Sequence, residues 1–124
     1  MRDQRLWTWH LAAGLVILVL LGLHMAVMHL DALLNVFNRA GGHPIDWANV
    51  VDRARSAFFM VTYIILLGAA LFHGLYGLRH IIDELNPAEG LRKVVNTVLL
   101  VGGIGLFAVG SWAAWASFQL ARSI

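Results

Sequence analysis

Three long apolar stretches dominate the chain and leave few choices of fold. They run from about residue 7 to 30, from 57 to 82 and from 94 to 120. A helix needs about 20 predominantly apolar residues to cross a bilayer, and each stretch is long enough. We therefore predict an all-α integral membrane protein with three transmembrane helices, built as a single domain over residues 1–124.

The composition agrees with a membrane protein and excludes several functions. Of the 124 residues, 60% are hydrophobic and 13% are charged, which is too apolar for a soluble domain of this size. The absence of cysteine excludes disulfides, Cys-ligated zinc, iron–sulfur clusters and Cys-linked haem within the chain. A net charge of +2 without a basic run predicts no nucleic-acid partner. We expect no cleaved signal peptide, because no small-residue cleavage site follows the first stretch before Asp31.

The connections predict how the helices are joined. Residues 31–56 combine charge with the turn signal Gly41-Gly42-His43-Pro44, so we expect a short amphipathic piece and then a loop. Residues 84–93, with Asn86-Pro87 and Gly90, predict a tight turn. The Gly- and Ala-rich third stretch favours close packing against other helices. Ordinary glycine usage in membrane helices is the alternative.

The basic residues give a weak indication of orientation. In an antiparallel arrangement, one side would carry five of them and the other side four, and the larger group includes those nearest the N-terminus. The two groups are Arg2, Arg5, Arg79, Arg92 and Lys93 against Arg39, Arg53, Arg55 and Arg122. The excess favours a cytoplasmic N-terminus, and we expect the protein in the cell (inner) membrane.

Two histidines lie inside the apolar stretches, His24 in LVLLGLHMAVMH and His73 in LGAALFHGLYGLRH. An ionisable side chain at bilayer depth is a functional-site hypothesis by default. Histidine is a common metal ligand and can hold haem iron, so we predict that both are axial ligands of haem b. Small residues that could admit a flat macrocycle flank both: Gly22, Ala26, Ala69, Ala70, Gly74 and Gly77. The alternative is a hydrogen bond to a neighbouring helix.

The positions of these two histidines along their helices predict that they do not share one iron. By helical rise, His24 lies about 25 Å from the Trp7 end and His73 about 14 Å from the Ile82 end. These two ends face the same side, so the histidines differ in depth by about 10 Å. The axial ligands of one iron need the same depth. The spacing therefore favours two haems, each with its second histidine from elsewhere.

Other polar residues near the helix ends could have either a functional or a purely structural role. Arg79 could reach a haem propionate or form an i,i+4 ion pair with Asp83. His80 could contact a propionate or a quinone, or simply lie at the interface. Asp83 could take part in proton exchange near a quinone. For His10, His29 and His43 we expect contact with headgroups or water.

The second stretch contains a motif that resembles a known family. HGLYGLRHIID at 73–83 is similar to the second-helix signature of the cytochrome b membrane anchors of succinate dehydrogenases and fumarate reductases. His73, Gly77, Arg79, His80 and Asp83 match in order, with the acid one residue earlier than is usual. HMAVMH at 24–29 is similar to the first helix of the two-haem anchors. The third stretch carries no motif.

The resemblance implies a haem b-binding membrane anchor subunit of a succinate:quinone oxidoreductase. Such a subunit passes electrons from the iron–sulfur subunit to membrane quinone. The partners would be a flavoprotein, an iron–sulfur protein and a second anchor chain, because single-chain two-haem anchors have five helices. Three helices would form half of a larger haem-binding bundle in the lipid.

The family's usual quinone-binding stretch, His-Arg-x-Ser/Thr-Gly, corresponds here to residues 10–14, which lack the arginine and the hydroxyl. Trp7, Trp9 and His10 could line a quinone site instead. An anchor of a quinol:fumarate reductase, or of another haem-b dehydrogenase, is one alternative. A non-haem assembly or transport subunit, whose histidines only bridge helices, is another.

Overall fold

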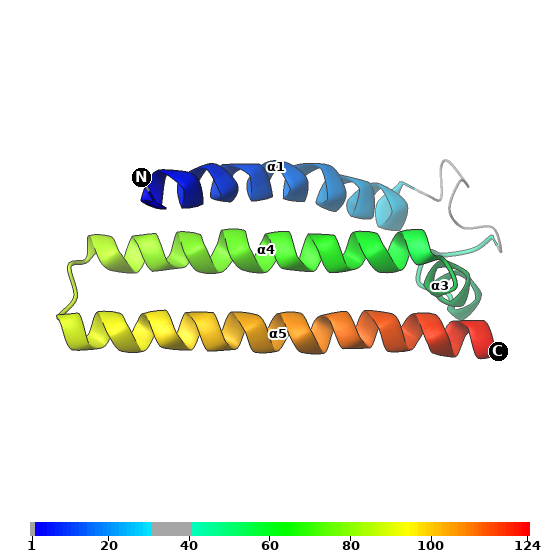
Figure 1. The fold of residues 1–124 in the computed structure, drawn as a ribbon. Helices are drawn as coiled ribbons and strands as arrows, with labels where there is room; N and C mark the ends of the chain where they lie inside the picture. Colours follow the sequence, from blue (N-terminus) through cyan, green and yellow to red (C-terminus); the bar gives the residue numbers. More distant parts are fainter. Residues whose placement is uncertain (1, 31–40) are drawn as a thin grey trace.

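The protein is almost entirely helical in the part of the chain that the structure describes. A computed structural model describes residues 2–30 and 41–124 (Figure 1). These ranges contain helices and connections but no strand, as the sequence predicts. The helices are α1 (Arg2–His29), α3 (Trp47–Ala54), α4 (Ala57–Glu84) and α5 (Glu89–Ser123). The amphipathic piece expected first in the connection 31–56 lies outside the described residues.

The three long helices form one layer with α4 in the middle (Figure 1). Helix α4 packs against α1 on one side and against α5 on the other, whereas α1 and α5 make no contact in the described ranges. The N-terminus of α1, the end of α4 and the start of α5 lie at the same end of the layer. A single layer has two open faces, so most apolar side chains have no partner within the chain.

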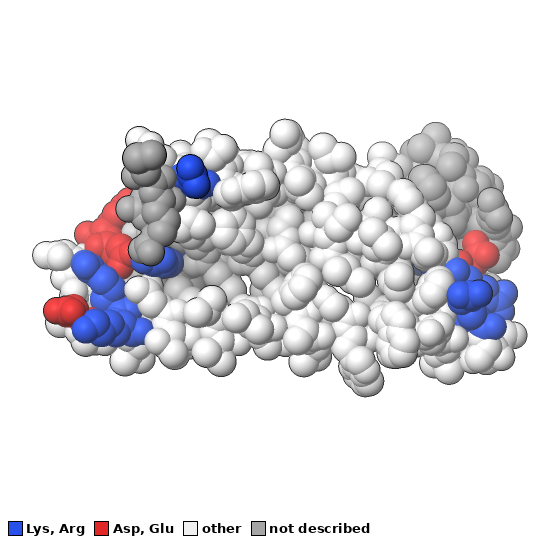
Figure 2. All heavy atoms as spheres, viewed as in Figure 1, with Lys and Arg blue, Asp and Glu red and all other residues white. Residues whose placement is uncertain are grey.

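The surface of this layer is that of a membrane protein. Among the described residues, Val27 and Ala121 are the only buried hydrophobic side chains. Residues Gln4–His29, Ala57–Glu84 and Glu89–Ser123 are long and apolar enough to cross a membrane. Charged side chains gather at the two ends, and the face between them shows none (Figure 2). The chain is therefore an all-α membrane protein, as predicted.

Helix α3 corrects one prediction. Residues 47–54 were expected to be a loop and instead form two turns of helix that pack against α4 and α5. Asn49 Nδ2 donates to the carbonyl of Gly41 at 2.8 Å, and Arg53 donates to the carbonyl of Pro44. These side chains are four residues apart on one helix face and hold the preceding loop. Eight residues are too short for apolar periodicity to reveal the helix.

The long helices extend beyond the apolar stretches at most of their ends. Helix α5 begins at Glu89 rather than 94 and ends at Ser123 rather than 120. Backbone hydrogen bonding continues through flanking polar residues, whereas hydropathy marks only the part suited to lipid. The turn between α4 and α5 lies where Asn86-Pro87 predicts it, and Asn86 adopts the left-handed conformation with φ of 49°.

Glycines set the close packing between α4 and α5, as expected for the third stretch. A Cβ atom at Gly103 would lie 2.7 Å from Leu75 Cδ1, and one at Gly68 would lie 3.1 Å from Phe107 Cε2. A Cβ at Gly110 would collide with Leu67. A Cβ atom at the neighbouring Gly102 would have no neighbouring atom within 4 Å in the described residues.

We expect Gly103→Val to destabilise the protein by about 1 kcal/mol, the lower end of the cost of overpacking, because the added methyl groups displace Leu75 Cδ1, the end of a flexible side chain. Gly102→Val introduces the same side chain one residue away, in open space, and is the matched control. The thermal unfolding midpoint in detergent measures both. Equal midpoints for the two variants would contradict this packing.

Candidate functional site

His73 lies in the interface between α4 and α1, against His10. Its Nδ1 is 3.0 Å from the backbone carbonyl oxygen of His10, a distance suited to an N–H donated to that oxygen. The two imidazole rings are stacked, with centroids 4.0 Å apart and planes 4° apart. In the described part of the chain, Nε2 of His73 has no hydrogen-bond partner. A proton on Nδ1 leaves Nε2 as the nitrogen with a free lone pair.

Two glycines make this close approach possible. A Cβ at Gly14 would lie 3.0 Å from Cε1 and 3.2 Å from Nδ1 of the His73 ring. A Cβ at Gly77 would lie 3.3 Å from Cε1 of His10. Each histidine therefore packs over a glycine of the opposite helix. The expectation that Gly77 admits a macrocycle is wrong within this chain, because the His10 ring covers it.

Aromatic rings continue from this pair toward the end of the layer. Trp7 stacks on His10, with centroids 5.3 Å apart, and lies edge-on to His80 at 6.1 Å. Tyr76 contacts His10 at 5.3 Å and His80 at 4.5 Å. The structure thus brings together Trp7, His10, His73 and His80 of the predicted site residues. Trp9 is 68% exposed and lines a separate groove between α1 and α4.

His10 is the residue whose surroundings differ most from the sequence prediction. Contact with headgroups or water was expected, but His10 is buried and its Nδ1 has no hydrogen-bond partner among the described residues. A buried polar atom without a partner costs about 1–3 kcal/mol. One signal for this position exists in the sequence: His10 and Gly14 are four residues apart and share one face of α1.

His24 lies far from this cluster, beside Tyr63 of α4. Their rings meet edge to face with centroids 5.9 Å apart. The hollow beside His24 holds about 20 Å³, bordered by residues that include Val27, Phe59 and Tyr63. Ligand pockets usually have about 300–1,000 Å³, so no cofactor fits there within this chain alone. Gly22 was expected to flank a macrocycle, and a Cβ atom built at this position would have no neighbouring atom within 4 Å in the described residues.

The two predicted ligands lie at different depths, by more than the sequence suggested. His24 is level with Tyr63, and Tyr63 precedes His73 by ten residues, or about 15 Å along α4. The expected difference was about 10 Å. The larger value arises because helix register, rather than the apolar stretch ends, sets which residues are opposite one another.

His10 and His73 do not form a ligand pair for one iron either. Axial ligands of haem lie on opposite faces of the macrocycle, with each ring edge directed at the metal. The two imidazoles here are face to face. The residues that the structure describes contain no group of three or more His, Cys, Asp or Glu side chains suited to holding a metal ion.

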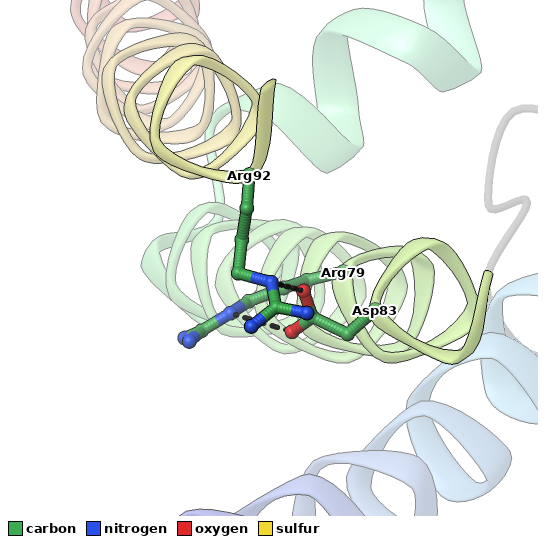
Figure 3. Close-up of polar contacts among 3 residues, drawn as sticks. All are labelled: Arg79, Asp83 and Arg92. Atoms are coloured by element: carbon green, nitrogen blue, oxygen red, sulfur yellow. Dashed lines mark ion pairs between the residues drawn. The ribbon is translucent and has the colours of Figure 1, made fainter. Parts of the chain in front are cut away.

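The charged residues of the motif lie at the end of the layer where α4 meets α5. Arg79 Nε is 3.6 Å from Asp83 Oδ2, which is the i,i+4 ion pair considered as one reading of the sequence. Arg92 of α5 also contacts Asp83, with its Nε 3.2 Å from Oδ1 (Figure 3). Asp83 therefore links the two helices between two guanidinium groups. The contact of Arg92 with Asp83 could not be predicted from the sequence, because the two residues lie on different helices.

The fold and the site define an all-α membrane protein with three candidate spans and two histidines at different depths within them. The chain is similar to the succinate dehydrogenase hydrophobic membrane anchor subunit of Thermoplasma acidophilum, with 26% identity over 89 residues. This match confirms the resemblance to succinate dehydrogenase membrane anchors that the motif predicted.

The match covers 71% of this chain and 65% of the relative. The chain thus matches slightly less than two-thirds of that protein's length. No family model matches the chain, and no solved structure does.

Proposed function

We propose that this chain is a haem b-binding membrane anchor subunit of a succinate:quinone oxidoreductase. In this role it passes electrons from an iron–sulfur subunit to membrane quinone. The observation that carries the proposal is the held imidazole of His73, with its Nδ1 at 3.0 Å from the His10 carbonyl. Metal-bound histidines generally donate their other ring N–H to such an acceptor. The similarity to a succinate dehydrogenase anchor supports the proposal.

His73 and His24 would each bind the iron of a different haem b. His73 fits this role because the carbonyl of His10 orients its ring and leaves Nε2 free. His24 fits it only at a surface shared with another chain, because the hollow beside it is too small. A haem supplies one-electron transfer at such a site. Arg79 and His80, at the same end of α4, are the candidates to bind propionates or quinone.

The open faces of the helix layer support the predicted partners. Helix α4 has no buried residue, so a second anchor chain could supply both the covering helices and the missing ligands. A flavoprotein and an iron–sulfur protein would complete the complex at the cytoplasmic end, beside the N-terminus, in the cell (inner) membrane. Trp7, Trp9, His10 and Asp83 are the candidates near a quinone. Among these four residues His10 is buried against His73, whereas Trp9 is exposed and lines a groove. Trp9 is therefore the residue that a quinone could reach most easily.

The purified complex is expected to show a b-type α-band after reduction with dithionite, in a haem-to-complex ratio near two. An absent band would contradict the cytochrome assignment and favour the reading in which the histidines only bridge helices. Operation in the direction of fumarate reduction is the second candidate within electron transfer. Steady-state assays with succinate and with quinol plus fumarate distinguish the two directions.

A further inference from the structure

A long apolar groove runs between α4 and α5, apart from the histidine cluster. Its volume is about 560 Å³, within the range of ligand pockets. Gly68 and Phe107 border one end, and Arg79 and Asn96 border the other. The rest of the lining is almost wholly aliphatic and aromatic. The groove is therefore apolar along its length and polar at one end.

The length of the groove corresponds to one leaflet of a bilayer. Gly68 and Arg79 are eleven residues apart on α4, which is about 16 Å by helical rise. The hydrocarbon core of a bilayer is about 30 Å thick, so one leaflet contributes about 15 Å. The groove thus reaches from the charged end of the layer to the middle of the membrane.

Arg79 is the charged residue that lines the polar end of the groove. Together with Arg92 and Lys93 it lies near three carboxylates, Asp83, Glu84 and Glu89, so this end as a whole carries no net charge. Asp83 is the one carboxylate shared by Arg79 and Arg92, and the nearby Glu89 is paired with Lys93 at 2.8 Å. Arg79 contacts Asp83 through Nε, and its terminal nitrogens point away from that carboxylate (Figure 3). Among the described residues these terminal nitrogens have no acceptor. Asn96 Oδ1 is buried there and lacks a hydrogen-bond partner in the same ranges.

We propose that this groove binds one anionic phospholipid, with an acyl chain between α4 and α5 and its phosphate on Arg79. The apolar length excludes a free phosphate as the natural ligand. The terminal nitrogens of Arg79, whose one carboxylate partner is shared with Arg92, favour an anionic over a zwitterionic headgroup. A planar fork of N–H donors suits phosphate oxygens. Neither His24 nor His73 lines the groove, so the proposed axial ligands are not part of this site. Arg79 would bind the lipid phosphate here in place of a propionate or quinone, and His80 keeps that role.

The test is a titration of the detergent-solubilised, delipidated complex with phosphatidylglycerol, followed by native mass spectrometry. A parallel titration uses phosphatidylcholine. One phosphatidylglycerol is expected to bind more tightly than phosphatidylcholine. Arg79→Gln is expected to weaken it about fivefold, the effect of about 1 kcal/mol per basic residue near anionic lipid. Arg79→Lys keeps the charge and should retain most of the affinity. Arg5→Gln removes an exposed charge outside the groove and should change nothing.

A second variant tests the apolar part without changing charge. Leu100 lines the groove and is 64% exposed, so Leu100→Trp fills space without disturbing a packed contact. It should abolish the tight binding of phosphatidylglycerol while the thermal unfolding midpoint is kept. Unchanged binding in both Arg79→Gln and Leu100→Trp would overturn the proposal. So would a loss of extractable quinone in Leu100→Trp with phosphatidylglycerol binding intact, because the groove would then hold quinone.

Discussion

Replacing His73 with alanine is expected to remove about half of the b-type haem absorbance of the purified complex, because one of two irons loses an axial ligand. His24→Ala should remove the other half. The physical reason is the separation of the two side chains, about 15 Å along the helices, which prevents them from binding the same iron. The dithionite-reduced spectrum at matched protein concentration measures the effect.

His29→Ala and His43→Ala are the controls for this prediction, because both side chains are exposed and neither contacts the cluster around His73. They should leave the absorbance unchanged. Equal loss of both haem signals in one of the two alanine variants, with none in the other, would rule out the two-haem assignment. No loss in either variant would rule out ligation by these histidines.

Gly14→Val is expected to disturb the haem that depends on His73 while the histidine itself remains in place. A Cβ at Gly14 would lie 3.0 Å from Cε1 and 3.2 Å from Nδ1 of that ring, so the imidazole must move away from the carbonyl of His10. Overpacking of this kind costs about 1–3 kcal/mol. It would lower the fraction of correctly held imidazole about 5- to 150-fold.

Electron paramagnetic resonance of the oxidised complex, with the reduced absorbance spectrum, measures this change. The signal that His73→Ala removes should shift or disappear in Gly14→Val, and the signal that depends on His24 should stay. Gly102→Val, at a glycine with open space around it, is the control for adding a branched side chain to a membrane helix. An unchanged spectrum in Gly14→Val would show that the contact between α1 and His73 does not hold the ligand.

The candidate site was partly predictable from the sequence. The pair of Arg79 and Asp83 follows from i,i+4 spacing alone, and the structure contains it. The different depths of His24 and His73 follow from helical rise, although the register of the two helices makes the difference larger. By contrast, His10, Tyr63 and Arg92 have partners on another helix. No local pattern identifies those partners, because they depend on how each helix is rotated about its axis.

The amino-acid sequence by itself determined the three membrane-spanning helices and the presence of two ionisable side chains within them. It could do so because a bilayer imposes its requirement on each segment separately, through length and hydropathy. Only the tertiary structure decided that His73 packs on His10 over Gly14, and that Asp83 joins α4 to α5 through Arg92. Such contacts depend on helix register and close approach at glycine, which are properties of pairs of helices rather than of one segment.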